Sequence, residues 1–314
     1  MINFYLFLIL ATMTAIIAKA GINSRQEPSA KGVERHMTST PRYIGRQGTD
    51  FQQTEGVAYS ADGTPIGFVK LGSGPSLIIV HGSLSTGREW LPVAAAIADR
   101  FTCYLMDRRG RGLSGDSGEY SLEKELDDIK AILDLAGSSP YLLGHSYGAI
   151  CALEAANRFS VSKLVLYEPP IPVHSPVLGP ELNDCLSAAE RNQLDEALAI
   201  GLRGLLKMSE REVAALRRMP MWAEMTALTP TWIRELEVLK RLEFGVARFV
   251  TIVSPTLLLI GTVNPPHHIE ASRVLEQILP RARLVELVGH SHQGHLTATA
   301  KFAHAVAKFL SESY

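Results

Sequence analysis

A serine placed for nucleophilic chemistry stands in the sequence Gly-His-Ser-Tyr-Gly at residues 144–148. An apolar run precedes this sequence, and a helix-forming stretch follows it without a break. Strand, tight turn and helix is the context in which G-x-S-x-G marks a nucleophile, because the glycines leave room for so sharp a turn. The helix that starts at Ser146 also favours negative charge that builds up beside it. The pattern therefore predicts attack of the Ser146 hydroxyl on a carbonyl carbon, which requires a base, an acid and an oxyanion hole.

The elements that must position this serine alternate along the chain. Apolar runs that predict strands alternate with helix-forming stretches, as in a parallel sheet with helical crossovers. A continuous apolar run is typical of a strand buried on both faces, and Asp62-Gly63 between two short strands predicts a hairpin. The expected strands are the hairpin at 57–71, then 76–80, 101–106, the run before Ser146, 163–167, 255–261 and 283–288; the expected helices are 90–98, 121–135, the stretch after Ser146, 269–279 and a last one ending near 310.

This alternation stops between about 171 and 248. The segment is poor in strand patterns and rich in helical periodicity, as at Leu198 and Leu202. Pro220 and Pro230 predict two joints that divide it. Because the segment follows the end of a strand, we expect it to lie over the functional face as a helical cap.

Five matches in chain order make the sequence resemble the α/β-hydrolase superfamily over about residues 55–312. The resemblance implies an α/β-hydrolase fold: a mostly parallel eight-stranded sheet, helices on both faces and a helical cap inserted after the sixth strand. It also implies a core formed by 55–171 and 250–314, with the cap at 172–249. The five matches are the His81-Gly82 loop, the turn at 107–114, the elbow at Ser146, the strand end Leu166-Tyr167-Glu168-Pro169 and a histidine loop after the last strand.

The resemblance makes Ser146 the nucleophile and implies the two donors of its oxyanion hole. These are the backbone N–H groups of Tyr147, which follows the nucleophile, and of Ser83, which follows His-Gly. Two fixed donors of this kind are worth about 3 kcal/mol each to the transition state. We expect His81 and His145 to orient loops through hydrogen bonds and not to act as the base.

The base is expected in the loop after the last strand, where His290, His292 and His295 compete. The family pattern is an apolar strand end, then glycine, any residue, a small residue and histidine. The sequence Leu-Val-Gly-His-Ser-His at 287–292 fits this pattern with His292 as the base. A neutral imidazole with a pKa near 6.5 can take the serine proton and return it to the leaving group.

The acid position departs from the family pattern. The family most often carries an aspartate in the loop after the next-to-last strand, but here that loop holds no carboxylate and Asn264 takes the aligned position. Some branches, haloalkane dehalogenases among them, carry the acid after the strand that precedes the cap, where Glu168 stands. We therefore assign the acid to Glu168. A structural role for Glu168, with a Ser-His-Asn arrangement in its place, stays open.

Asp107 and the arginines that follow it are expected to be structural. In many family members this aspartate belongs to a turn beside the active site, so it is left out of the triad. The arginines at 108, 109 and 111 are expected on a solvated face or as partners of Asp107 and Asp116.

Composition narrows the class of partner. The 314 residues carry a net charge of −1, which gives no basic surface for nucleic acid. Cys103, Cys151 and Cys185 lie far apart without C-x-x-C spacing, and the first two fall in elements that should be buried. We expect core cysteines there, not disulfides or metal ligands.

The N-terminus allows two interpretations. Residues 4–18 are uncharged and apolar, with the length of a signal-peptide core, and Ala-Lys-Ala at 18–20 offers a cleavage site. No basic residue precedes this stretch, so a reverse membrane anchor fits about as well. We expect 1–20 to be a signal peptide or hydrophobic segment that exports or anchors the protein, with membrane contact only through 4–18. If translation starts at Met37, the protein is cytoplasmic. Residues 21–54 are expected to form a flexible lead-in.

These features predict an esterase-like serine hydrolase that forms an acyl-enzyme and needs no cofactor or metal. Trp222 and Trp232 in the cap suggest an apolar pocket, so the expected substrate is a small apolar ester, thioester, lactone or amide. A serine at 146 excludes the dehalogenase mechanism, which needs aspartate there.

Two other functions remain open. The first is a metallohydrolase, because 290–295 has the H-x-H-x-x-H spacing of a di-zinc site, although Gly294 replaces its aspartate. The second is a ligand-binding protein on the hydrolase fold, without catalysis or only weakly catalytic, because Asn264 leaves the usual acid position without a carboxylate.

Overall fold

The computed structural model describes residues 42–44, 50–173, 177–204, 206–242, 246–264 and 266–313. The expected signal or anchor segment at 1–20 lies outside the described residues, as does most of the expected flexible lead-in. Two short strands within that lead-in are described: β1 (Arg42–Ile44) and β2 (Asp50–Gln52) pair antiparallel as a separate sheet. Among the described residues, no helix has both the length and the apolar character needed to cross a bilayer.

Eight strands form one sheet in the order β10-β9-β8-β7-β5-β6-β4-β3. All neighbours pair in parallel except around β4, which is antiparallel to β3 and to β6. The chain runs outward from β5 to β6 and then crosses back to β7, so the strand order reverses beside β5; such a point is where open α/β sheets bind ligands. The strands are β3 (Thr54–Tyr59), β4 (Pro65–Gly72), β5 (Ser76–Val80), β6 (Thr102–Met106), β7 (Tyr141–His145), β8 (Lys163–Tyr167), β9 (Thr256–Gly261) and β10 (Ala282–Leu287).

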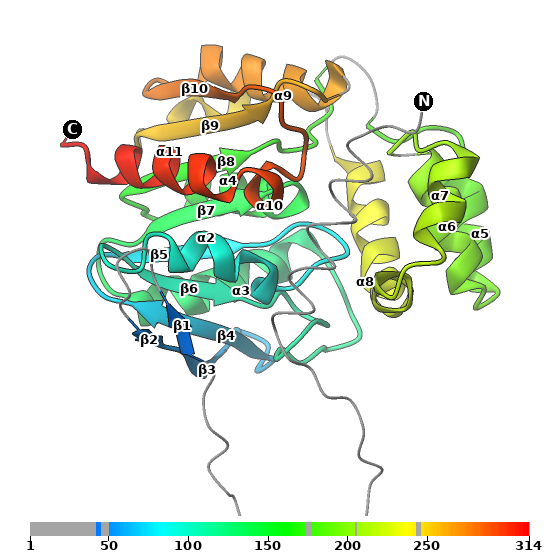
Figure 1. Cartoon of the computed structure of the whole chain (residues 1–314), viewed down its shortest axis with the longest axis horizontal. Coiled ribbons are helices and arrows are strands. Elements are labelled where there is room, and N and C mark those ends of the chain that lie inside the picture. The colour runs from blue at the N-terminus through cyan, green and yellow to red at the C-terminus, as the bar shows by residue number, and fades with distance from the viewer. Residues whose placement is uncertain are drawn as a thin grey trace, which may run out of the picture.

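Helices cover both faces of this sheet (Figure 1). One face packs against α3 (Leu122–Ala136), α4 (Tyr147–Arg158) and α9 (Pro266–Ile278), and the other against α2 (Leu91–Ala95) and α11 (Thr299–Ser311). The continuous apolar strands serve both layers, because alternate residues of a strand point to opposite faces. The strands and helices therefore match the expected order, and Ser121 caps α3 by accepting a hydrogen bond from the Lys124 N–H at 3.3 Å.

A helical insertion, α5 to α8, separates β8 from β9 and has a hydrophobic core of its own. Figure 1 shows these helices gathered beside the sheet and not over its faces. The joint expected at Pro220 is confirmed, since α8 begins directly after it, but the joint at Pro230 is wrong because this proline lies inside α8. Packing of Trp232 and Leu236 into the insertion core holds the helix together past the proline. The helices are α5 (Leu182–Glu190), α6 (Leu194–Gly204), α7 (Glu210–Leu216) and α8 (Met221–Arg241).

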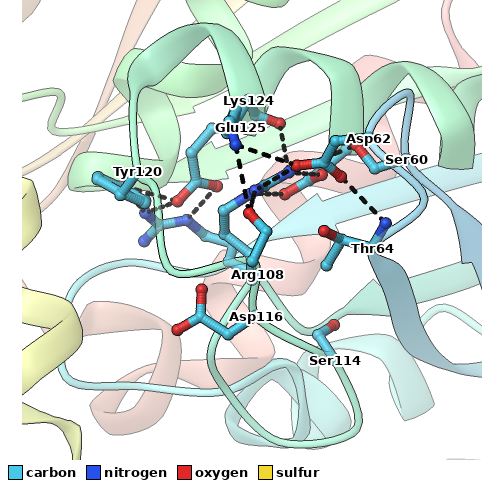
Figure 2. A network of polar contacts seen from close by, with 12 residues as sticks. Ser60, Asp62, Thr64, Arg108, Ser114, Asp116, Tyr120, Lys124 and Glu125 are labelled. Atoms are coloured by element: carbon cyan, nitrogen blue, oxygen red, sulfur yellow. Dashed lines mark hydrogen bonds and ion pairs between the residues drawn. The ribbon is translucent and has the colours of Figure 1, made fainter.

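The arginines after β6 are not on a solvated face, and this expectation is wrong. The side chains of Arg108, Arg109 and Arg111 are fully buried and paired with carboxylates. Figure 2 shows Arg108 beside Glu125 and Tyr120. Arg108 binds Glu125 of α3, and both Arg108 and Arg111 reach Glu235 of α8. The partners lie on α3 and α8, 17 residues from Arg108 and 124 residues from Arg111, so the arginine run alone could not reveal them.

Asp107 and Asp116, the expected partners of these arginines, bind other groups. Asp107 accepts hydrogen bonds from the backbone N–H groups of Gly87 at 2.7 Å and Leu113 at 2.8 Å. Burial raises the pKa of Asp107. Asp116 pairs with Arg234 of α8 at 2.9 Å. The structural role expected for Asp107 is thus the bracing of two loops at the end of β6.

Candidate active site

Ser146 occupies a strained turn between β7 and α4. Its φ is +54°, a left-handed conformation that costs a non-glycine residue energy and is typical of functional turns. A Cβ at Gly144 would lie 2.4 Å from the Gly148 carbonyl oxygen, and one at Gly148 would lie 2.4 Å from the carbonyl oxygen of Val80. Both positions therefore need glycine, as the G-x-S-x-G pattern requires.

Glu168 lies beside Ser146 because their strands pair in register. His145 at the end of β7 pairs with Tyr167 at the end of β8, so the next residue of each strand leaves the sheet at the same edge. The Ser146 N–H donates to the Tyr167 carbonyl at 2.9 Å, which ties the two turns together. Glu168 is also strained, with φ at +50°. Strain at both residues is consistent with side chains held in fixed directions for function.

The structure brings Glu168 and His292 together. Glu168 Oε2 lies 2.5 Å from Nδ1 of His292, and the carboxylate is fully buried while the imidazole is 20% exposed. A carboxylate can only accept, so Nδ1 carries the proton and Nε2 is left as the basic nitrogen. This is the tautomer that a general base for serine requires.

Asn264 occupies the usual position of the acid and contacts both members of this pair. Its Nδ2 donates to Glu168 Oε1 at 2.5 Å, and its Oδ1 accepts from the backbone N–H of His292 at 2.8 Å. The Gly261 N–H donates to the same Glu168 oxygen at 2.6 Å. The amide therefore joins the Glu168 carboxylate to the loop of His292, a contact that the sequence analysis did not predict.

Tyr167 is a second residue that the sequence analysis missed. Its hydroxyl donates to the Ser291 carbonyl at 2.6 Å and accepts from the Gly294 N–H at 2.9 Å, on either side of His292. A tyrosine at the end of the buried strand Lys163–Tyr167 was the available signal, because a buried hydroxyl needs a partner.

The other two histidines of this loop, His290 and His295, have different partners from His292. His290 Nδ1 lies 3.3 Å from Thr297 Oγ1, and His295 Nε2 lies 2.8 Å from Glu89 Oε1. The three imidazoles thus turn to three different partners, so the H-x-H-x-x-H spacing does not converge on one point. Burial, with a contribution from Lys301, lowers the pKa of His290.

The two expected oxyanion donors lie on either side of Ser146. Tyr147 is the first residue of α4, so its N–H has no acceptor within the helix. Ser83 follows Gly82, and a Cβ at Gly82 would lie only 3.0 Å from Ser146 Cβ. The bare glycine backbone is what lets the Ser83 loop approach the serine this closely.

His81 and His145 hold loops, as expected. His81 Nε2 accepts from the Arg108 N–H at 3.1 Å, and His145 Nε2 lies 3.1 Å from the His292 carbonyl oxygen. Burial is the main reason that the pKa of His81 and the pKa of His145 both lie well below the usual value. Both rings are therefore neutral near pH 7.

A cavity of about 190 Å³ opens at these residues, between the ends of the sheet strands and the insertion. The sheet side contributes the polar groups, including Ser83, Ser146 and His292. The insertion side is apolar; it is lined by Leu178, Leu206, Met221, Met225, Trp232, Leu236 and Leu239. No lysine or arginine is among the described residues that line the cavity. It therefore suits a small ligand that is apolar at one end and polar at the other.

Comparison with known proteins agrees with this architecture. The family profile described as "Alpha/beta hydrolase family" matches residues 77–306, most of the chain. The chain belongs to the alpha/beta hydrolase family. The matched range of this alpha/beta hydrolase includes Ser83, Ser146, Glu168 and His292. The expected fold is confirmed, and the family makes the protein a hydrolase.

The chain is also similar to solved structures and to curated relatives. An alpha/beta hydrolase from Sphaerobacter thermophilus is 31% identical, with a TM-score of 0.74 over 82% of this chain and 100% of that one. N-formylmaleamate deformylase of Pseudomonas putida is 39% identical over 32% of this chain and 39% of its own length. 2-(Acetamidomethylene)succinate hydrolase of Mesorhizobium japonicum is 37% identical over 28% of this chain and 32% of its own length. The chain thus matches only about a third of the length of these two relatives.

Proposed function

We propose that the protein is a serine hydrolase in which Ser146 is the nucleophile, His292 the base and Glu168 the acid. The observation that carries the proposal is the 2.5 Å contact between Glu168 and His292 Nδ1, at strand ends next to the Ser146 turn. The hypothesis of a ligand-binding protein was based on Asn264, which leaves the usual acid position without a carboxylate. The contact between Glu168 and His292 weakens this argument, because a carboxylate from the neighbouring strand holds the imidazole instead.

The proposed reaction follows from these positions. The Ser146 hydroxyl attacks the substrate carbonyl while His292 Nε2 takes its proton, and Glu168 stabilises the imidazolium that forms. The oxyanion is held by the N–H groups of Ser83 and Tyr147. His292 then gives the proton to the leaving group, and an acyl-enzyme remains on Ser146. A water activated by His292 attacks the acyl carbon and releases the acid.

The cavity sets the proposed substrate class. Its insertion side is apolar and the described lining lacks lysine and arginine, so it favours a small neutral acyl group. The insertion would then act as the cap of the site. The names of the two curated relatives, a deformylase and a hydrolase of an acetamido compound, support an amide among the candidate bonds. We propose that the substrate is a small apolar ester, thioester, lactone or amide.

A fluorophosphonate probe tests the nucleophile directly. Wild type should be labelled at one serine, and Ser146→Ala should not be labelled. Hydrolysis of 4-nitrophenyl esters of rising acyl length then reports the substrate class, with short acyl chains preferred because the cavity is small. Wild-type protein that reacts no more than Ser146→Ala would remove the enzyme proposal and leave ligand binding.

A further inference from the structure

Glu89, His145 and His295 form a cluster beside the cavity, and the proposed reaction uses none of these side chains. One ligand atom from each residue lies within 4.8 Å of the other two. They come from three distant parts of the chain: the turn before α2, the end of β7 and the short helix α10 (Gly294–Thr297). His145 is 3% exposed and His295 is 0% exposed, so both imidazoles are buried. Glu89 and His145 border the cavity. A small ion could reach the cluster through that cavity.

The hydrogen bonds of His145 leave a lone pair without a partner. A carbonyl oxygen can only accept, so the contact between His145 Nε2 and the His292 carbonyl fixes the proton on Nε2. Nδ1 then carries a lone pair, and it has no hydrogen-bond partner although it is buried. A Cβ at Gly82 would lie 3.2 Å from Nδ1, so the atom faces the backbone of the cavity-lining loop. A buried polar atom left unpaired costs about 1–3 kcal/mol.

His295 likewise has a buried ring nitrogen without a hydrogen-bond partner. Its Nε2 donates to Glu89 Oε1 at 2.8 Å, and its Nδ1 has no partner. The ring is stacked on Trp90 with centroids 4.4 Å apart and planes 7° apart, so its direction is set before any ligand arrives. Two imidazoles and a carboxylate thus meet, and each imidazole has one ring nitrogen, Nδ1, without a hydrogen-bond partner.

We propose that Glu89, His145 and His295 bind a divalent transition metal ion such as Zn²⁺. Two imidazole nitrogens and one carboxylate oxygen are a preferred donor set for this class of ion, with the fourth position open to the cavity. Bonds of about 2.1 Å place tetrahedral donors about 3.4 Å apart. Glu89 Oε1 and His295 Nε2 already lie 2.8 Å apart, so the spacing that must shorten, by at most about 1.4 Å from the 4.8 Å limit, is the one to His145.

Binding needs no change in the charge of the imidazoles. If the ion takes His295 Nε2, the ring must change to the tautomer that carries its proton on Nδ1. His145 offers a lone pair that carries no proton, and burial keeps its pKa well below the usual value. The ion would lie on the wall that Ser83 and Ser146 share. It would therefore compete with substrate, a consequence that rests on the proposed function, whereas binding itself does not.

Calorimetric titration of the metal-free full chain with Zn²⁺ tests the site. We expect a site in wild type whose affinity falls by more than about tenfold in Glu89→Gln and in His295→Gln. His290→Gln is the matched control, because its ring lies in the same loop and is bonded to Thr297 instead. Zinc should also raise the Tm of wild type and of His290→Gln, but not that of Glu89→Gln.

The outcomes separate this inference from the proposed function. Absence of binding to wild type, or binding that the Glu89 and His295 substitutions leave unchanged, would overturn the metal site. Wild type that fails the fluorophosphonate assay but binds Zn²⁺ through Glu89 would remove the hydrolase mechanism and keep the metal site. If both hold, Zn²⁺ should inhibit ester hydrolysis competitively, and more weakly in Glu89→Gln.

Discussion

Replacement of Glu168 by glutamine should reverse the tautomer of His292. The oxygen Oε1 accepts from the Gly261 N–H at 2.6 Å and from Asn264 Nδ2 at 2.5 Å. Two donors at this position require the glutamine to keep its oxygen there. Its NH₂ group must then face His292 Nδ1, in place of the oxygen that lies 2.5 Å away in the wild type. A donor at this point forces the lone pair of His292 onto Nδ1 and the proton onto Nε2, the nitrogen that should accept the proton of Ser146.

The wrong tautomer is costly. Replacement of the triad acid by its amide lowers kcat about 10⁴-fold in a serine protease, which corresponds to about 5.4 kcal/mol. We expect a loss of that order in kcat for Glu168→Gln, with little change in KM because the side chain is fully buried and does not border the cavity.

Asn264→Ala is the matched comparison. It removes one donor to Glu168 and one acceptor from the His292 backbone, but Gly261 still holds the carboxylate. Two hydrogen bonds of about 0.5–1.5 kcal/mol each predict a loss of about 10- to 100-fold. Both variants are assayed with the same 4-nitrophenyl ester after their near-UV circular dichroism is compared with wild type. A loss in Asn264→Ala equal to or larger than that in Glu168→Gln would refute the assignment of the acid.

Two further predictions concern stability. Glu235→Leu should lower the free energy of unfolding, measured in urea, by about 3 kcal/mol, because Arg111 loses its buried carboxylate. Asp116→Asn breaks the more exposed pair with Arg234 and should lower it by about 1 kcal/mol or less. Equal costs for the two variants would contradict this view of the network. Acid should also destabilise the fold. Folding lowers the pKa of His81 and of His145, chiefly by burial, so below about pH 6.5 the unfolded chain binds more protons than the folded chain. Each histidine then lowers the free energy of unfolding by up to about 1.4 kcal/mol per pH unit until its folded pKa is reached. Urea unfolding between pH 7 and 5 measures this slope, and a flat profile would count against it.

Local signals in the sequence were enough to predict the secondary-structure elements and the turn at Ser146. The glycines around Ser146, the apolar runs of the parallel strands and Asp62-Gly63 act through backbone geometry and burial within a few residues, so their meaning is visible in the chain. The observed β3–β4 hairpin and β5 follow from such signals. The loop pattern likewise singled out His292 from its neighbours, and that role remains a prediction.

The contacts between side chains of distant segments could be read from the folded structure but not from the sequence. Glu168 and Asn264 were alternatives in the sequence, but strand pairing puts both on one imidazole loop, Glu168 at Nδ1 and Asn264 at the backbone N–H. The arginines after β6 looked solvated because a charged run usually is; their burial depends on carboxylates of α3 and α8, more than ten and more than a hundred residues away. Helix continuity through Pro230 likewise depends on packing within the insertion. Contacts between distant segments depend on how the whole sheet and its helices assemble, and no local pattern of residues records them.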